Sequence, residues 1–285
     1  CVWVCFCSCG IVFADAGFKF LYGAAESSII GSQVSGNNFV DTVKLQAVKD
    51  DDGVCVGLFS GNKDVELSQM NAAPTGVTGQ SMMINNTPIA KYPAFTPNTT
   101  LNFGADSKAV IPSLVYLDAG QINLKAKYNV GGVNLVGSSN DFWVSPYKLA
   151  ARAHSGGNNI DGDSHTSTTT HKAGQAFNFT VTAYNSLGTG LSNITKNYIP
   201  NDIQVLLART GPTIDGFDGV LNYGSGGLSS AILPIYQSIS LTPFSGGVSV
   251  ANNASYSEVG LLNLDIQDLN YGYSGNIVSG DAINI

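Results

Sequence analysis

One polar stretch of the sequence carries the residue types of a calcium-binding loop. Asn159, Asp161 and Asp163 occupy alternate positions, and a glycine separates the last two. Loops that bind Ca²⁺ present carboxylate and amide oxygens at every second position in this way. The distal acid that completes an EF-hand is missing, so the pattern predicts either a calcium site or a polar loop that is simply solvated.

The sequence gives less support to a histidine metal site, a nucleophilic active site or a phosphate-binding loop than to a calcium site. His154, His165 and His171 fall in one polar region, and their spacing fits no standard zinc pattern, so we expect free side chains. The sequence contains no Gly-x-Ser-x-Gly elbow, and its glycine pairs lack the lysine and helix of a phosphate-binding loop. We therefore expect a non-enzymatic protein with no cofactor other than, at most, calcium.

Two acids belong to a motif that occurs twice, 140 positions apart. Residues 116–124 and 256–264 share the pattern Tyr, x, acid, small apolar, Gly, x, Ile/Leu, Asn, Leu. One interpretation is that Asp118 and Glu258 are catalytic acids. However, an acid two positions before a glycine, here Gly120 or Gly260, is typical of a tight corner whose backbone N–H groups bond the carboxylate. The repetition favours structural corner motifs in both places.

The elements around these motifs alternate apolar and polar residues, as strands with one buried face do. Residues 43–48 and 179–184 form a second echo in the same order. Two echoes at nearly the same offset indicate tandem duplication, although short alternating strands also resemble one another by chance. Strands at sandwich spacing and the acid-x-Gly corner predict an all-β protein of two tandem immunoglobulin-like β-sandwich domains. We expect an apolar, cysteine-rich segment at 1–10 and domains at 11–147 and 148–285.

The composition excludes several classes of partner. Charged residues make up only 12% of the chain, against roughly 25% in ordinary soluble domains. A formal net charge of −7 and the lack of a basic stripe argue against nucleic acid and against an anionic membrane surface. No apolar run reaches the length of a transmembrane helix. A surface rich in Gly, Ser, Thr and Asn suits an extracellular or surface-exposed β-protein.

The cysteines cluster at the start of the sequence. Cys1, Cys5, Cys7 and Cys9 lie in the first nine residues, and Cys55 stands apart from them. Three of the four would share one face of a strand, where neighbouring thiols are too far apart for an easy disulfide. Apolar surroundings without a nearby histidine also disfavour a metal cluster. The sequence does not decide the fate of these four thiols.

The segment 2–13 is apolar on both faces of a strand, and it would template edge-to-edge pairing if it were exposed. We expect it to be cleaved, as the end of a signal peptide would be, buried within its own domain, or donated to a neighbour. Donation of an apolar strand to a partner's open sheet is the mechanism of donor-strand assembly, and its repetition would build a filament. The chain lacks an initiator methionine, so we expect a processed or truncated product.

Several phrases of the sequence resemble a known family. They are Asp-Ala-Gly-Phe-Lys-Phe at 15–20, Gly-Val-Cys-Val-Gly-Leu-Phe at 53–59, the first corner motif at 116–124, the run 137–147 and Lys-Ala-Gly-Gln-Ala-Phe at 172–177. Together they resemble the C-terminal β-rich region of MshQ-like proteins, which are linked to the mannose-sensitive haemagglutinin type IV pilus. That region has no assigned activity. Residues 65–76 lack the cysteines that often follow this position in the family, which leaves Cys55 without the partner that the resemblance would supply.

The resemblance implies a bacterial cell-surface or pilus-associated protein. We therefore expect a non-enzymatic structural or adhesion protein, located extracellularly or on the bacterial surface, whose partners are other surface or pilus proteins or copies of itself. Two alternatives stay open. One is a self-assembling filament subunit that uses its apolar N-terminal strand as the donor. The other is a carbohydrate-binding module that stacks glycans on Trp143, Tyr223, Tyr271 and Tyr273, although Trp143 lies in an alternating strand that favours core packing.

Overall fold

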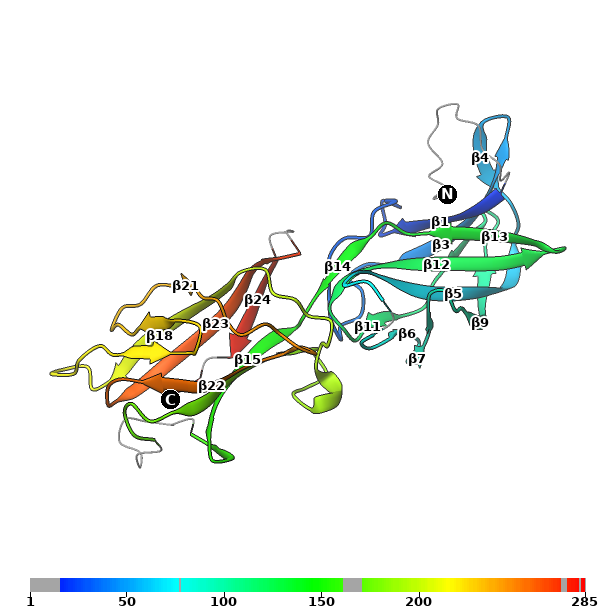
Figure 1. The fold of residues 1–285 in the computed structure, drawn as a ribbon. Coiled ribbons are helices and arrows are strands. Elements are labelled where there is room, and N and C mark those ends of the chain that lie inside the picture. The colour runs from blue at the N-terminus through cyan, green and yellow to red at the C-terminus, as the bar shows by residue number, and fades with distance from the viewer. Residues whose placement is uncertain (1–15, 77, 161–170, 273–275, 282, 285) are drawn as a thin grey trace. The chain divides into compact units, whose positions relative to one another are not determined.

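The computed structural model describes residues 16–76, 78–160, 171–272, 276–281 and 283–284. These residues form strands and one short 3₁₀ helix, Leu191–Asn193. The chain divides into two compact units, Cys1–Val144 and Ser145–Ile285. The all-β class of two tandem sandwiches that the sequence predicts is confirmed (Figure 1). Among the described residues, no helix is long and apolar enough to cross a membrane.

The first unit is built from two main sheets. One contains β1 (Ala16–Tyr22), β3 (Val43–Asp51), β4 (Val54–Gly57) and β10 (Lys108–Val110). The other contains β2 (Gln33–Val34), β5 (Gly61–Ala73), β8 (Ala90–Lys91), β9 (Thr96–Phe103), β12 (Gly120–Val130), β13 (Val133–Ser138) and β14 (Phe142–Ser145). A small third sheet holds β6 (Met82–Ile84), β7 (Thr87–Pro88) and β11 (Leu114–Tyr116). The β12–β13 hairpin is the long green pair in Figure 1.

Alternation in the sequence accounts for the core of this unit. On β3, Val43, Leu45 and Ala47 are buried, and the residues between them lie nearer to solvent. On β12, Ile122 and Leu124 are buried in the same way. Successive side chains of a strand point to opposite faces, so each strand contributes one apolar stripe to the space between the sheets. The burial of these stripes is the main stabilising contribution to the unit.

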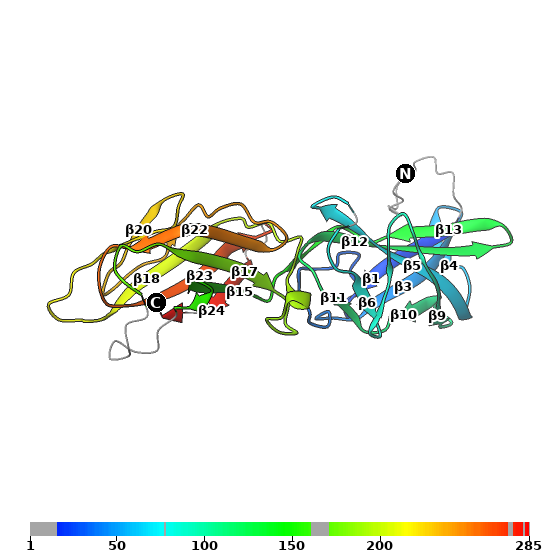
Figure 2. The same cartoon turned by 60° about the horizontal axis from the view of Figure 1, so that its bottom comes forward.

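The second unit has one continuous sheet that folds into two layers. One layer follows the order β20 (Gly227–Ser229), β19 (Val220–Asn222), β22 (Val248–Tyr256), β17 (Phe177–Tyr184) and β15 (Lys148–Ser155). The other follows β24 (Asn276–Asp281), β23 (Leu261–Tyr271), β18 (Ile203–Gly211) and β21 (Gln237–Ser238). The short strands β16 (Asn158–Asn159) and β25 (Ile283–Asn284) flank β15 and β23. β24 joins the layers, because it pairs in parallel with β15 and antiparallel with β23. β17 pairs with β22, and Figure 2 shows the two strands side by side.

The two units repeat one set of backbone contacts around their first strand pairs. Ala47 pairs with Phe18 across β3 and β1, and Ala183 pairs with Leu149 across β17 and β15. The Ala47 N–H donates to the carbonyl of the residue just before β10, at 2.9 Å. The Ala183 N–H donates to the carbonyl of the residue just before β22, also at 2.9 Å. The two copies of the second echo, residues 43–48 and 179–184, therefore lie on strands with matching neighbours.

The repeated corners are also built alike. Gly120 opens β12, which pairs with β5, and Gly260 precedes β23, which pairs with β18. The glycines have φ angles of +120° and +139°, which side chains rarely adopt. A Cβ atom would lie 2.5 Å from the Ala73 carbonyl oxygen at Gly120 and 2.3 Å from the Gly211 carbonyl oxygen at Gly260. Each of those carbonyls belongs to a residue that precedes a cis proline.

Cys55 differs from the expectation. It lies on β4 and is disulfide-bonded. The family resemblance had left it without a partner, because residues 65–76 contain no cysteine. The sequence offers only Cys1, Cys5, Cys7 and Cys9 as partners, and these four residues lie outside the described range.

Candidate binding pocket of the second unit

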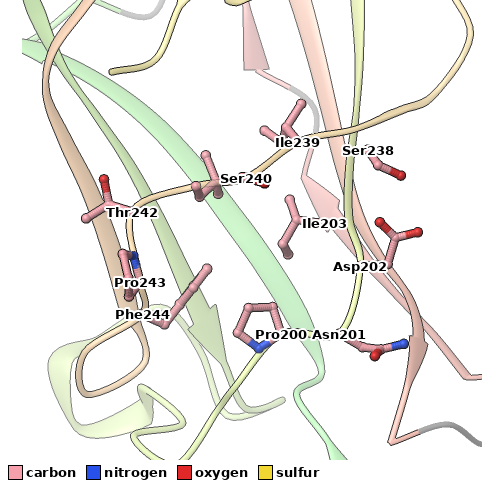
Figure 3. A pocket seen from close by; sticks show the side chains of 11 residues that line it. Pro200, Asn201, Asp202, Ile203, Ser238, Ile239, Ser240, Thr242, Pro243 and Phe244 are labelled. Carbon is pink, nitrogen blue, oxygen red and sulfur yellow. The ribbon is translucent and has the colours of Figure 1, made fainter. Parts of the chain in front are cut away.

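A pocket of about 340 Å³ opens at the start of β18. It is lined by residues 200–203, which lead into that strand, and by residues 238–244, which connect β21 to β22. The strand pairing between β18 and β21 covers only Gln204 and Val205. One further backbone bond, from Ile239 N–H to the Ile203 carbonyl at 2.8 Å, continues it. Beyond that bond the two segments separate, and the pocket lies between them (Figure 3).

A buried carboxylate holds one wall of the pocket. Asp268 on β23 is 0% exposed. Its Oδ1 accepts from the Asp202 N–H at 2.7 Å, and its Oδ2 accepts from the Tyr198 hydroxyl at 2.7 Å. The Asn201 N–H lies 3.1 Å from both oxygens. Burial raises the pKa of Asp268 above its usual value, although these donors oppose the shift. The carboxylate thereby fixes residues 201 and 202 against the sheet.

Aromatic contacts hold the opposite wall. The Tyr198 ring meets the Phe244 ring edge to face, with centroids 5.0 Å apart and planes at 88°. On its other side Tyr198 lies 5.5 Å from Tyr271. Burial, together with the nearby Asp268 carboxylate, raises the pKa of the Tyr198 hydroxyl well above its usual value. Tyr198 therefore links the carboxylate to the ring that lines the pocket.

The lining combines an apolar centre with side-chain hydroxyls that are available for hydrogen bonding. Pro200, Ile203 and Phe244 surround the middle of the pocket in Figure 3. The hydroxyls of Ser238, Ser240 and Thr242 belong to the same lining, and none of them hydrogen-bonds another residue within the described chain. This arrangement can hold a small ligand by apolar contact and hydrogen bonds.

One ionised group, Asp202, lies among the lining residues. Its Oδ2 accepts from Gln204 Nε2 at 2.9 Å, and Oδ1 has no partner in the described part of the chain. The neighbouring Asn201 uses its Nδ2 on two backbone carbonyls, each at 3.1 Å. The lining therefore presents acceptors and hydroxyls, and it contains no cation.

The acids and glycines of the repeated motif lie elsewhere. Asp118 is fully buried, and its carboxylate accepts from the backbone N–H groups of Gln80 at 2.6 Å and Ala119 at 2.8 Å. Glu258 is partly buried in the second corner. Asp118 thus holds the corner at Gly120, whereas Glu258 has its Cβ close to Gly219, and neither acid lines the pocket.

The predicted calcium loop is described only at its edge. Asn159 is exposed on β16, where it pairs with His154, whereas Asp161, Asp163 and His165 lie outside the described residues. His171 contacts the Gln175 carbonyl at 2.9 Å. Among the described residues no three His, Cys, Asp or Glu side chains gather as a metal site would require. Calcium binding by this loop stays a prediction, which loss of thermal stability on chelation would support.

Two aromatic residues proposed as stacking faces are buried instead. Tyr223 is 6% exposed and Tyr271 is 1% exposed, so neither offers a ring face to a glycan. Trp143 is partly buried on β14, and Tyr273 lies outside the described residues. Tyr271 instead packs on Tyr198, within the support of the pocket. The sequence showed that these residues are aromatic, but their exposure depends on which sheet face is covered.

The residues that build the pocket had only a faint signal in the sequence. Asp268 stands at the next alternate position after Leu262, Leu264 and Ile266, all of which are buried. An acid on the apolar face of a strand needs a hydrogen-bonded partner, so this break in the pattern could have marked it. Tyr198 and Phe244 carried no comparable signal, because they lie in segments without alternation.

Comparisons with known proteins agree with the architecture of the first unit. Residues 4–138 match the family model described as "Domain of unknown function (DUF6701), first Ig-like domain". No curated protein matches the chain. The C-terminal domain of the AgI/II polypeptide BspA of Streptococcus agalactiae matches at 10% identity and a TM-score of 0.30, covering 94% of this chain and 99% of that one. The C-terminal domain of the antigen I/II-family protein AspA of Streptococcus pyogenes matches at 10% identity and a TM-score of 0.28, covering 95% and 99%.

Proposed function

We propose that this chain is a non-enzymatic structural or adhesive part of a bacterial cell-surface protein. The observation that carries the proposal is the repetition of one immunoglobulin-like sandwich, with the same corner at Gly120 and Gly260. Sandwich modules of this kind occur in many cell-surface proteins, where loops and faces on a rigid frame make the contacts. The family model over residues 4–138 names a first Ig-like domain, which agrees with a repeated design.

The disulfide at Cys55 supports a location outside the cytoplasm. Disulfides persist in oxidising compartments and are rare where glutathione and thioredoxin keep thiols reduced. A low content of charged side chains, 12%, and a net charge of −7 fit the same setting. Association with a pilus is the finer part of the proposal, and its support is the resemblance of the sequence to MshQ-like proteins.

Labelling of intact cells tests the location and the role. Antibodies raised against the folded two-unit protein should label the intact bacteria that produce it, and protease added outside should remove the signal. A strain without the protein should attach less well to surfaces. Immunogold electron microscopy should place the label on pili if the finer proposal holds. A signal that appears only after lysis would contradict the whole proposal, and label away from pili would contradict the finer part alone.

The filament subunit remains an alternative with its own test. The proposed donor strand, residues 2–13, lies outside the described residues. The disulfide at Cys55 nevertheless limits where an N-terminal cysteine could lie. A bond to an N-terminal cysteine of the same chain would hold that residue beside β4, because bonded cysteines have Cα atoms about 4.4–6.8 Å apart. We therefore expect purified protein to appear as single particles by electron microscopy. Filaments that vanish when residues 1–10 are deleted would instead establish donation.

Carbohydrate binding is a second candidate, and the pocket at the start of β18 is the observation that favours it. The pocket combines an apolar centre with free hydroxyls and a carboxylate. Of the aromatic faces that the sequence suggested, Tyr223 and Tyr271 are buried.

A further inference from the structure

We propose that the pocket at the start of β18 binds one uncharged pyranose ring of a glycan. This inference rests on the proposed adhesive role and names the ligand that one unit would recognise. It concerns residues 200–203 and 238–244, to which the repeated motif assigns no role.

The size of the pocket suits a single small group. Its volume of about 340 Å³ lies near the lower end of the range of roughly 300–1,000 Å³ that ligand sites occupy. A polymer could therefore enter by one residue at its end or by one branch. Recognition of one terminal unit is what an adhesive module needs when its target is a surface coated with branched chains.

The apolar centre fits the face of a sugar ring. Pro200, Ile203 and Phe244 line the pocket, and Figure 3 shows the Phe244 side chain directed toward the space between the other two. The axial C–H groups of a pyranose make each face of the ring partly apolar, and burial of one face against apolar side chains removes both surfaces from water. The edge-to-face contact with Tyr198 keeps the Phe244 ring from turning away.

The polar lining fits the hydroxyls at the edge of the same ring. Asp202 Oδ1 is an acceptor without a partner in the described chain, and a carboxylate forms stronger hydrogen bonds than a neutral oxygen. The hydroxyls of Ser238, Ser240 and Thr242 can each donate or accept, as sugar hydroxyls can. A ligand that lacked hydroxyls would leave these groups desolvated and unpaired, which is costly.

The charge of the lining selects against acidic sugars. Asp202 is the one ionised residue of the lining, and no lysine or arginine accompanies it. A sialic acid or a sulfated sugar would bring a second negative charge next to this carboxylate, and the two would repel each other. The pocket should therefore prefer neutral hexoses.

The pocket is also held in shape before a ligand arrives. The Asp202 side chain faces the pocket, while its backbone N–H is bonded to the fully buried Asp268 carboxylate at 2.7 Å. Tyr198 connects that carboxylate to Phe244 through one hydrogen bond and one ring contact. Walls that are already fixed reduce the conformational entropy lost on binding. The network also gives a reason for keeping a buried acid on the apolar face of β23.

A glycan array tests the inference with the full two-unit protein as the probe. Glycans that end in a neutral hexose should be retained, and sialylated or sulfated chains should not. The free monosaccharide of the best glycan should then be titrated by calorimetry. Asp202→Asn should weaken binding by at least about tenfold, because the charged acceptor is lost. The matched control is Asp215→Asn, which makes the same change at an exposed residue outside the pocket and should alter affinity less than about twofold.

Four results would overturn the inference. The first three are an array on which the folded protein retains no neutral glycan, retention of acidic glycans alone, and binding that Asp202→Asn leaves unchanged. The fourth is preference for a basic peptide over every sugar, because a cation would then be the natural partner of Asp202. An empty array combined with positive labelling of intact cells would remove this inference alone and leave the proposed function standing.

Discussion

The two corner glycines allow a sharp test of the repeated design. Gly120→Ala and Gly260→Ala each place a methyl group where the backbone has a φ of +120° or +139°. The new Cβ would lie 2.5 Å from the Ala73 carbonyl oxygen in the first unit and 2.3 Å from the Gly211 carbonyl oxygen in the second. Real Cβ atoms essentially never come closer than 3.0 Å to such atoms, so the backbone itself must move.

The magnitude follows from two contributions. Holding a side chain in a backbone region reserved for glycine costs about 1–3 kcal/mol. Relieving the overlap with a carbonyl oxygen in a packed corner costs about 1–3 kcal/mol more. The free energy of unfolding of the affected unit should therefore fall by about 2–6 kcal/mol, which is a large part of the total for an ordinary domain.

Two control glycines separate these contributions. Gly131 has a φ of +57° and nothing within 4 Å of its Cβ position, so Gly131→Ala carries only the left-handed cost of about 1–2 kcal/mol. Gly31 has open space and no unusual φ, so Gly31→Ala should be neutral or slightly stabilising. Hydrogen exchange with mass spectrometry on the full chain reads the opening of each unit separately. The reasoning is refuted if both corner variants cost no more than Gly131→Ala, or if either one destabilises the other unit instead of its own.

Further predictions concern buried groups. Asp268→Ala should lower stability by about 3–5 kcal/mol in denaturant unfolding, because the Tyr198 hydroxyl and two backbone N–H groups lose their acceptor, whereas Asp268→Asn should cost less. Burial raises the folded-state pKa of Asp268 above 3.8, so the folded chain holds this proton more tightly than the unfolded chain does. The stability gained from that proton is full below pH 3.8 and is lost as pH rises through the folded pKa, while the hydrogen bonds to the carboxyl oxygens remain; this slope should vanish in Asp268→Asn. Burial, with a hydrogen bond to Asp265, raises the pKa of Tyr236 from its usual 10.0 to about 12. The stability that this hydroxyl proton contributes is therefore full below pH 10.0 and is lost as pH rises through about 12. Tyr236→Phe should remove that late step from an ultraviolet titration, and a profile without any change would contradict the assignment. Peptide mapping without reductant should find Cys55 joined to a cysteine of the first nine residues, and a free Cys55 thiol would contradict the structure.

The sequence by itself determined the fold class and the strands that repeat. Alternation along residues 43–48 and 261–266 is a local property, because a strand buries every second side chain whatever lies opposite. The corner motif could also be predicted from the sequence, because an acid and a glycine two residues apart constrain only their own turn. These features needed no knowledge of distant contacts, and the all-β class that they predicted is the one observed.

Only the tertiary structure decided what surrounds these elements. Tyr198 and Asp268 are 70 residues apart in the sequence, and their hydrogen bond exists because β18 and β23 are neighbours in one sheet. Tyr271 was expected at the surface and is 1% exposed, and the Tyr198 ring packs against it. The bond at Cys55 and the carbonyls that abut the corner glycines likewise depend on which segments meet. Local pattern sets the side of a strand on which a residue points, whereas burial, pairing and pocket shape depend on the partner that covers that side.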